Sequence, residues 1–251
     1  MREETPDHLA AQLRARLLFL RESGIASWAR SRPAAPISGL SGSPSIVPAA
    51  VSAERISDPA GCLEELRAEI GDCRLCRLCE KRTHLVFGTG NPQARVMFVG
   101  EGPGYEEDRQ GLPFVGKAGQ LLNRIIQAMG MSREQVYIAN VVKCRPPENR
   151  TPLPDEAAVC SAFLRRQIKI VRPQVICALG SVAVGTLLQS SAPISRLRGQ
   201  FRNLDDGTPV MPTFHPAYLL RNPEKKKEVW EDIKLILDFL ARNPRSEASG
   251  A

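Results

Sequence analysis

Four cysteines stand at spacings that are typical of a metal centre. Cys73 and Cys76 form a C-x2-C pair among arginines, and Cys144 follows 68 residues after Cys76, with fifteen residues between it and Cys160. Thiolates at such spacings bind zinc or an iron-sulfur cluster, and both accept four thiolates in a tetrahedral arrangement. We therefore expect one four-thiolate site, and the spacing alone leaves its metal open.

The other three of the seven cysteines fit different roles. Cys177 lies in an apolar run and Cys62 near a linker, so both fit ordinary core cysteines. Cys79 adds a third thiol to the first pair, but the C-x3-C-P continuation of a bacterial ferredoxin is missing, which disfavours electron transfer. Replacement of a neighbouring ligand by Cys79 stays open.

Two side chains suited to electrostatic or acid-base chemistry each follow an apolar run. Glu101 stands in Gly-Glu-Gly-Pro-Gly at 100–104, and His215 in Thr-Phe-His-Pro-Ala at 213–217. The glycine-rich turn is a weak candidate for phosphate binding, because its spacing is not G-x-G-x-x-G and Pro103 removes one amide donor. His8 and His84 fit solvated surface positions.

These residues need a frame that brings the ends of apolar runs together. Short apolar runs alternate with helical patterns after residue 61, which predicts a three-layer α/β/α sandwich around a central four-stranded parallel sheet. The predicted strands are Arg95 to Gly100, Val136 to Val142, Val175 to Leu179 and Val210 to Phe214. The predicted helices are Lys117 to Met129, Pro154 to Val171, Ser181 to Leu188 and Pro223 to Ala241. Ligands gather at the carboxyl ends of such strands.

Composition divides the chain into four regions. We expect an amphipathic helix within residues 1–30, a flexible linker at 31–60, a globular domain at 61–243 and a disordered tail at 244–251. The helix pattern runs from 6 to about 24, and its leucine face can dock on the core, on a protein partner or on nothing stable. In the linker, twenty of thirty residues are Ser, Pro, Ala or Gly and four are charged, so it cannot bury a core.

Charge and hydropathy narrow the functional classes. The 34 Lys and Arg exceed the 27 Asp and Glu, giving a net charge of +7 that suits a polyanionic partner such as nucleic acid. No run of 18 apolar residues and no secretory pattern at the amino terminus is found, so we expect no membrane partner and a cytoplasmic location. Cysteines in such a protein are reduced thiols or metal ligands rather than disulfides.

Taken together, the motifs resemble the family 4 uracil-DNA glycosylases from Cys73 to about Leu240. The matching segments are Gly-Glu-Gly-Pro-Gly at 100–104, Pro-Phe-Val-Gly-Lys-Ala-Gly at 113–119, Asn-Val-Val-Lys-Cys-Arg-Pro-Pro at 140–147, Pro-Asp-Glu at 154–156, and His-Pro at 215–216 with Leu219. The resemblance implies one 4Fe-4S cluster per chain, held by Cys73, Cys76, Cys144 and Cys160. It also implies a uracil-DNA glycosylase-like fold.

The resemblance also implies which residues bind the base. Phe114 would stack on a flipped uracil, which is worth about 1 to 3 kcal/mol, and Asn140 would hydrogen-bond its pairing edge. Gly102 belongs to the same uracil-binding segment and stands where related glycosylase families carry an acidic residue. The alternatives are core packing for Phe114 and a capped strand end for Asn140.

Cleavage of the glycosidic bond builds positive charge on the sugar and negative charge on uracil. We expect Glu101 to orient water or stabilise the sugar, and His215 to donate a hydrogen bond to the uracil oxygen. After His215, Leu219 is the expected apolar wedge that fills the hole in the base stack, and Arg221 is expected to contact phosphate, with a solvated helix face as its alternative.

The expected function is therefore excision of uracil from single- or double-stranded DNA by a monomeric hydrolase that starts base excision repair. Two alternatives within the superfamily remain. One is a relative that stays covalently bonded to the uracil site, although such relatives carry a histidine after the second strand and residues 143–151 contain none. The other is a non-catalytic iron-sulfur or zinc DNA-binding module.

Overall fold

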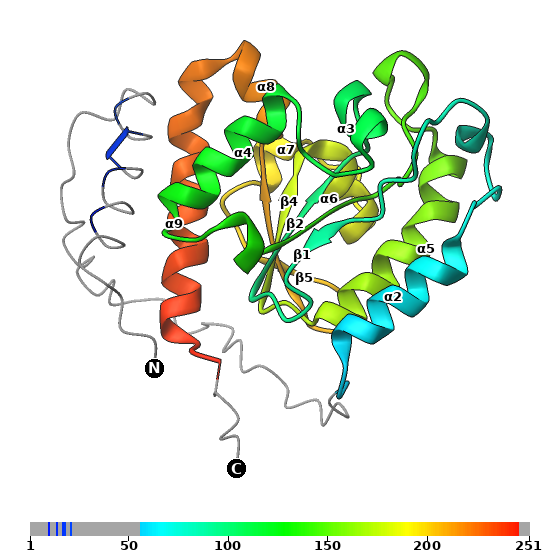
Figure 1. Cartoon of the computed structure of the whole chain (residues 1–251). Coiled ribbons are helices and arrows are strands. Elements are labelled where there is room, and N and C mark those ends of the chain that lie inside the picture. Colours follow the sequence, from blue (N-terminus) through cyan, green and yellow to red (C-terminus); the bar gives the residue numbers. More distant parts are fainter. Residues whose placement is uncertain (1–9, 11–13, 15–16, 19–20, 22–55, 246–251) are drawn as a thin grey trace.

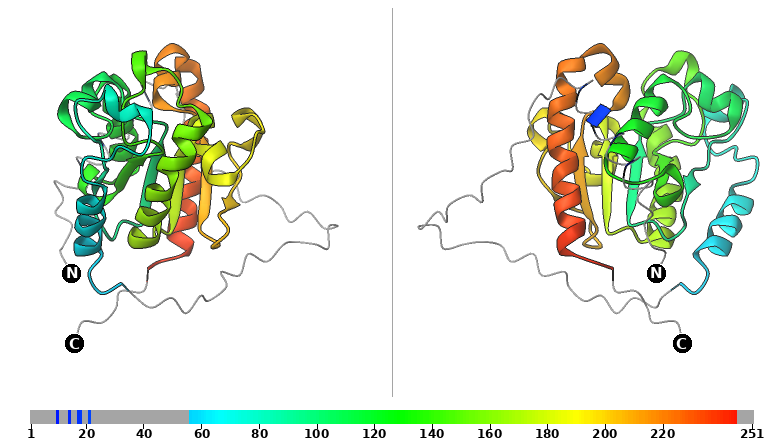
Figure 2. Two further views of the ribbon diagram at one scale, coloured as in Figure 1. Left: turned by 90° about the vertical axis from the view of Figure 1, so that its right-hand side faces the viewer. Right: turned by 60° about the vertical axis from the view of Figure 1, so that its left-hand side comes forward.

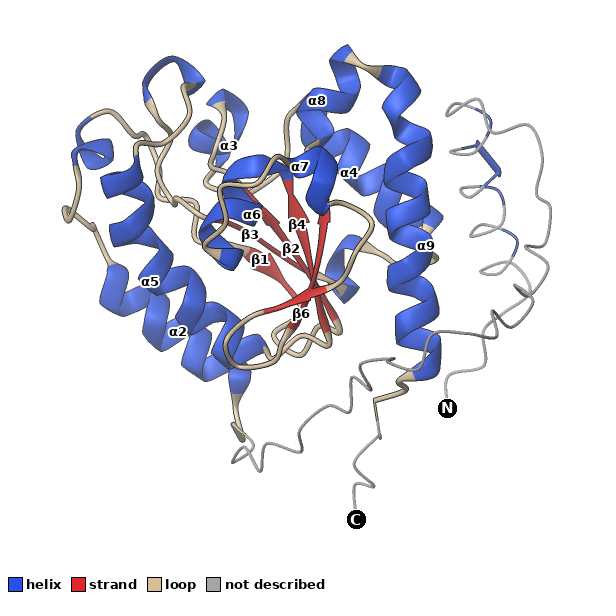
Figure 3. Ribbon diagram, turned by 180° about the vertical axis from the view of Figure 1, so that it is seen from behind, coloured by secondary structure: helices blue, strands red, loops and turns tan. Residues whose placement is uncertain are grey.

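A computed structural model describes residues 10, 14, 17–18, 21 and 56–245 of the chain. One sheet lies between two layers of helices, as Figure 1 shows from one side and Figure 3 from behind. The fold is thus the predicted three-layer α/β/α sandwich.

The sheet has six strands in the order β1-β3-β2-β4-β6-β5. Its four central strands are parallel and overlap the four predicted strands, with ends that differ by up to two residues, and a short antiparallel strand is added at each edge. The bounds are β1 Thr89–Gly90, β2 Val96–Gly100, β3 Tyr137–Asn140, β4 Val175–Leu179, β5 Arg202–Asn203 and β6 Pro209–Thr213. The edge strands were not predicted because two residues each, without an apolar run, give no periodic signal.

The central strands are apolar on both faces because both faces are covered. In β2, Val96 and Phe98 point into one core cluster, while Met97 and Val99 point into the other. Alternation along a strand places these pairs on opposite faces of the sheet. All five residues of β2 are buried, which explains the continuous apolar run in the sequence.

Helices from different parts of the chain share each layer (Figure 2). Buried residues of α4, α8 and α9 join one core cluster, and those of α2, α5 and α6 join the other. The bounds are α2 Pro59–Ile70, α3 Tyr105–Gln110, α4 Lys117–Ala128, α5 Pro154–Val171, α6 Gly180–Leu188, α7 Ile194–Leu197, α8 Pro216–Arg221 and α9 Lys226–Arg242. Short 3-10 helices lie at Arg77–Glu80, Arg133–Gln135, Pro147–Asn149 and Pro223–Lys225.

The predicted long helices agree with α4, α5, α6 and α9 to within a few residues, but α2 was not predicted. Its first residues, Pro59 and Ala60, fall in the segment expected to be linker. Asp58 caps this helix by accepting a hydrogen bond from the Gly61 N–H, and Pro59 occupies the first helical position.

The expected amino-terminal helix lies mostly outside the described residues. Ala10, Arg14, Leu17, Leu18 and Arg21 are helical and exposed. No helix in the described part of the chain is both long and apolar enough to cross a membrane.

Candidate functional site

The ends of β2 and β3 bring Phe114 and Asn140 to one point. A Cβ atom built on Gly100 would lie 2.5 Å from Oδ1 of Asn140 and 2.5 Å from Cζ of Phe114. Both side chains are buried, and Gly100 pairs directly with Asn140 across the sheet. Only a glycine leaves space there, so an aromatic ring and an amide meet at the carboxyl edge of the sheet.

The side-chain oxygen of Asn140 is buried and has no hydrogen-bond partner among the described residues. A buried polar atom that lacks a partner costs about 1 to 3 kcal/mol. Such an atom at a functional edge points to a ligand that supplies the missing donor. The donor groups of planar bases, which also stack on aromatic rings, fit this position.

Phe114 is held in an uncommon backbone conformation, with φ at 53°. The Glu107 carboxylate accepts hydrogen bonds from the Val115 and Gly116 N–H groups, both at 2.8 Å, and Arg133 donates to the Phe114 carbonyl at 3.2 Å. A Cβ on Gly119 would lie 2.0 Å from that carbonyl. Left-handed backbone at a bulky residue persists only where its surroundings impose it, as they do here.

Glu107 also connects this loop to the one that follows β2. Its second carboxylate oxygen accepts a hydrogen bond from the Gly104 N–H at 3.1 Å. One carboxylate therefore holds together the loops that carry Glu101 and Phe114. The sequence contained a signal for this residue, because an acidic side chain three positions after a helix cap commonly bonds back to the cap.

Glu101 follows β2 directly and is half-buried. Burial raises the pKa of its carboxyl group, and a hydrogen bond from the side chain of Thr151 opposes that shift. Next to it, a Cβ on Gly102 would lie 2.6 Å from Cγ2 of Val142, so this loop packs tightly on the segment after β3. A raised pKa in a partly enclosed carboxylate is common at functional sites.

His215 caps α8 at the end of β6. Its Nδ1 accepts a hydrogen bond from the Ala217 N–H at 3.1 Å, so the neutral ring carries its proton on Nε2. Burial lowers the pKa of His215 to about 4, and the nearby positive charge of Arg221 adds to the shift. The ring centroid lies 5.6 Å from that of Phe114. The structure thus places a neutral hydrogen-bond donor beside the aromatic platform.

A buried polar network supports the strand that delivers His215. Asp232 of α9 accepts hydrogen bonds from the Thr213 hydroxyl and from Arg198, both at 2.6 Å. Burial raises the pKa of Asp232 to about 6, against the opposing effects of Thr213 and Arg198. The network anchors the end of β6 to α9 and α7.

The expected wedge, Leu219, is buried in the core and only 1% exposed. It lies on the inner face of α8 and does not reach solvent in this conformation, and its role as the wedge stays a prediction. The next residue, Leu220, is 43% exposed. Arg221 is exposed at the end of the same helix, as expected.

The four predicted cysteine ligands come together. Cys73 and Cys76 precede or cap a 3-10 helix, Cys144 follows β3 and Cys160 lies in α5. They line one small cavity, whose lining also contains Cys79. None of the seven cysteines forms a disulfide.

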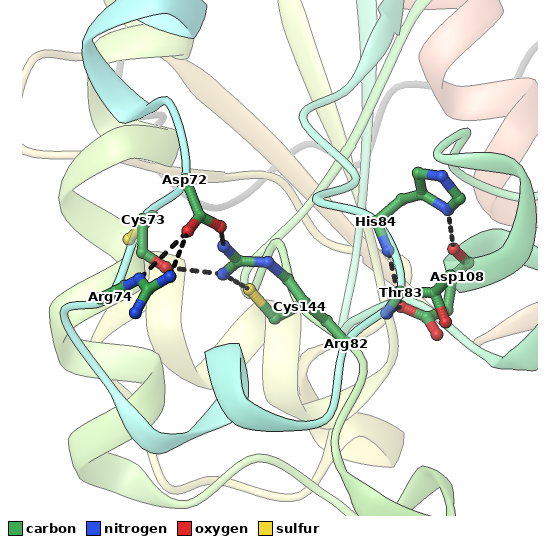
Figure 4. A network of polar contacts seen from close by, with 8 residues as sticks. All are labelled: Asp72, Cys73, Arg74, Arg82, Thr83, His84, Asp108 and Cys144. Carbon is green, nitrogen blue, oxygen red and sulfur yellow. Dashed lines mark hydrogen bonds and ion pairs between the residues drawn. The ribbon is translucent and has the colours of Figure 1, made fainter.

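Arg82 joins two of these ligands from inside the protein (Figure 4). Its guanidinium donates to Sγ of Cys144 at 3.2 Å and to the Cys73 carbonyl at 2.7 Å, and it pairs with Asp72. Only 6% of its side chain is exposed. A buried guanidinium bound to a sulfur favours the thiolate form of that sulfur.

Lys143 is the second buried cation beside the cysteines. Its ammonium group donates to the Asn140 carbonyl at 2.9 Å and to Gln167 Oε1 at 2.5 Å, both neutral acceptors. Its backbone N–H donates to Sγ of Cys160 at 3.3 Å. Burial lowers the pKa of Lys143 to about 8. Nothing in the sequence around Lys143 indicates that this lysine is buried.

This donor set fits a negatively charged metal centre. Burial raises the pKa of Cys76 and Cys160, and it raises that of Cys144 to about 11, so these thiols ionise readily only when a metal replaces their protons. Four thiolates together with their metal would carry a net negative charge, which the charges of Arg82 and Lys143 would offset.

Within the described residues, no three Cys, His, Asp or Glu side chains form a group recognisable as the site of one metal ion. The four cysteines share the lining of one cavity, and four thiolates suit either zinc or an iron-sulfur cluster.

Two buried carboxylates connect the cysteine segments to the loops of the pocket. Asp108 of α3 accepts a hydrogen bond from the Thr83 N–H at 2.8 Å, immediately after Arg82 (Figure 4). Glu156 accepts two hydrogen bonds from Arg150, at 2.7 and 2.8 Å. The second contact braces the loop between Cys144 and α5.

Comparison with known proteins agrees with this geometry. The model of the family described as "Uracil DNA glycosylase superfamily" matches residues 87–234. The type-4 uracil-DNA glycosylase of Thermotoga maritima is 46% identical over 183 residues, covering 72% of this chain and 95% of that protein. Those of Sulfurisphaera tokodaii and Saccharolobus solfataricus are 42% and 41% identical, each covering over two thirds of this chain (73% and 72%) and 86% and 88% of the relative. The chain therefore belongs to the type-4 uracil-DNA glycosylases, within the uracil-DNA glycosylase superfamily.

Proposed function

We propose that the protein excises uracil from DNA, leaving an abasic site for base excision repair. The observation that carries this proposal is the unsatisfied Oδ1 of Asn140 beside the ring of Phe114. In uracil, N3 bears a hydrogen that such an oxygen can accept, while the N3 of cytosine bears a lone pair that would face it. The pocket therefore selects the deaminated base over its parent.

Cleavage of the N-glycosidic bond uses charge at both ends of that bond. As the bond from C1′ to N1 breaks, its electron pair moves onto uracil, and Nε2–H of His215 donates a hydrogen bond to the uracil oxygen that gains charge. The ionised Glu101 stabilises the positive sugar or orients the water that attacks C1′. A proton from that water completes the hydrolysis by passing to solvent or to the site.

We further propose that Cys73, Cys76, Cys144 and Cys160 hold a 4Fe-4S cluster. The buried cations Arg82 and Lys143 support a centre of negative charge in that cavity. When bound, the cluster contributes structural cross-linking rather than a redox step, because glycosidic hydrolysis transfers no electrons. The chain's own residues then hold the cysteine segments against the loops that carry the pocket.

For DNA contact, we assign the wedge to Leu220 instead of Leu219, because Leu220 is exposed on the same helix. Arg221, next to it, is placed to bind a phosphate. We retain the proposals of a monomer that acts on single- or double-stranded DNA in the cytoplasm. A protein partner for the amino-terminal segment also stays a proposal.

The test is an excision assay on labelled oligonucleotides that contain one uracil, thymine or hypoxanthine, with abasic sites cleaved by alkali. Scission at uracil that weakens in His215→Ala supports the glycosylase. An absence of scission by protein with its full iron content would contradict it. A protein-DNA band that survives denaturation would instead identify the covalent relative.

Iron content and visible absorbance test the cluster separately. Cys144→Ala is expected to lose iron, stability and DNA binding together. A Cys62→Ala control, which changes a cysteine on α2 outside the cavity lining, should keep all three. A Cys144→Ala protein that stays folded and fully active would overturn the structural role.

A further inference from the structure

An exposed tyrosine lies beside two arginines, close in the chain to the loops of the candidate site. The Tyr105 side chain is 52% exposed at the start of α3. The guanidinium carbon of Arg145 lies 5.1 Å from its ring centroid, and that of Arg109 lies 5.8 Å away. Both distances are within the range of cation-π interactions.

The two principal members come from the two loops that build the pocket. Tyr105 follows Glu101 by four residues, and Arg145 follows Asn140 by five. These loops touch where Gly102 packs on Val142, and Glu101 bonds with Thr151. The pair therefore lies at the carboxyl edge of the sheet, where α3 and α8 both begin (Figure 3).

Arg145 is held in place rather than free in solvent. Its Nε donates a hydrogen bond to Oδ1 of Asn149 at 2.7 Å, within the loop that Glu156 braces through Arg150. Because Nε is already used, the two terminal nitrogens of the guanidinium remain for a ligand. A fixed guanidinium beside an exposed ring can bind a nucleotide through both its base and its phosphate.

We propose that Tyr105 and Arg145 form a second nucleotide subsite, which stacks a base neighbouring the extruded uracil and binds its phosphate. The proposal rests on the proposed function, since it assigns the neighbouring nucleotide of the same DNA. Base-aromatic stacking is tolerant of sequence, and the arginine adds a contact to the backbone. Tyr105 is thus a binding residue for DNA outside the uracil pocket.

The subsite favours single-stranded DNA. In a duplex, the neighbour of the flipped base is still paired and stacked on its other side, so its face reaches a protein ring only after a second disruption. In a single strand, the same face is available at little cost. We therefore expect the contribution of Tyr105 to be large on single strands and small on duplexes.

The test uses a single-stranded oligonucleotide that carries 2′-fluoro-2′-deoxyuridine, which resists excision, with 2-aminopurine at the nucleotide on either side. Stacking quenches 2-aminopurine fluorescence. The full-length protein is expected to quench the probe on one side, and Tyr105→Ala to abolish that quenching and weaken single-strand binding by roughly 5- to 150-fold. Tyr105→Phe should keep both, because the ring remains.

Matched controls separate the subsite from general charge and from folding. Arg145→Ala should weaken binding, whereas Arg165→Ala, which removes an exposed arginine from α5, should not. Each variant should melt like the parent protein. Duplex affinity of Tyr105→Ala should stay within about twofold of the parent, in line with the single-strand preference of stacking.

The subsite is wrong if Tyr105→Ala retains the quenching, or if it loses duplex and single-strand affinity equally. Uracil excision by the parent protein is scored in a separate assay. Excision together with unchanged quenching in Tyr105→Ala overturns the subsite and leaves the proposed function standing. Quenching that depends on Tyr105 without any excision overturns the glycosylase and leaves a DNA-binding surface.

Discussion

The ammonium group of Lys143 donates a hydrogen bond to the backbone carbonyl of Asn140 over 2.9 Å. The backbone N–H of the same lysine contacts Sγ of Cys160, and Gln167 links its ammonium to the hydroxyl of Tyr137. One fully buried residue thus touches the strand end that presents the base-reading amide and a ligand of the candidate cluster. The two sites are physically continuous.

Lys143→Met should therefore impair both sites. It leaves the Asn140 carbonyl and Gln167 Oε1 without their donor, and each unsatisfied buried acceptor costs about 1 to 3 kcal/mol. We expect the free energy of unfolding in urea to fall by that order, together with lower iron retention and slower excision. Lys169→Met, at an exposed position of α5, is the control and should change none of the three. Normal stability and iron content in Lys143→Met would contradict this account.

Asn140→Ala should lower kcat/KM for uracil while leaving the fold intact. The variant removes an oxygen that has no hydrogen-bond partner within the described part of the chain, so little native bonding is lost. Two hydrogen bonds to the base disappear, which is expected to reduce kcat/KM by roughly 10- to 100-fold. Excision kinetics test the expected loss of kcat/KM, and thermal melting of the same preparation tests whether the fold is intact. A large loss of stability would instead indicate a structural role for the amide.

The sequence predicted the parts of the site that follow strands. Glu101, Asn140 and His215 each come directly at or after the end of a buried apolar run, and parallel strands necessarily bring such ends to one edge. Cysteine spacing predicted that four cysteines share one cavity, which they reach from three segments: the stretch before a 3-10 helix, the loop after β3, and α5. The order of apolar runs and helices therefore predicts which edge of the sheet holds the functional side chains.

Burial set by distant partners was not predictable in the same way. In the sequence, Lys143 resembles an ordinary loop lysine. Its burial depends on Gln167, 24 residues away, which supplies an acceptor for its ammonium group. The position of Leu219 shortly after His215 suggested an exposed wedge. In the structure this segment forms α8, and the Leu219 side chain faces the core. Which face of a six-residue helix is buried depends on the layer packed against it, and six residues are too few to reveal a period.

Activity should rise with pH through the ionisation of Glu101. Burial raises the pKa of this carboxyl above its usual value of 4.5, and the ionised form is the active one. The acid limb of kcat/KM is therefore expected above pH 4.5, with no second step near pH 6.5, because His215 is already neutral there. A pH-rate profile of the parent and of Glu101→Gln checks this. The limb should vanish in the variant, and its persistence would assign it to another group.

The free energy of unfolding should depend on pH through the protonation of His215. Its pKa is about 4 in the folded protein and about 6.5 in an unfolded chain, so the unfolded chain binds a proton first as pH falls. The contribution of neutral His215 to the free energy of unfolding is therefore fully present above pH 6.5. As the pH falls from 6.5 toward 4, the free energy of unfolding decreases by up to about 3 kcal/mol. Urea denaturation at pH 7.5 and pH 5 measures it. His215→Gln should show a smaller difference between the two pH values, and an equal difference would assign the effect elsewhere.

Substitutions of Leu219 and Leu220 should have different effects, one on folding stability and the other on excision from duplex DNA. Leu219 packs in the core, so Leu219→Ala is expected to lower the free energy of unfolding by about 2 to 5 kcal/mol. Leu220 is 43% exposed, so Leu220→Ala should leave stability within about 0.5 kcal/mol of the parent. If Leu220 fills the gap left by the extruded base, its loss slows excision from duplexes, where neighbouring stacks must be held open, more than from single strands. Equal excision rates for Leu220→Ala and the parent on duplex DNA would contradict the assignment of a wedge to α8.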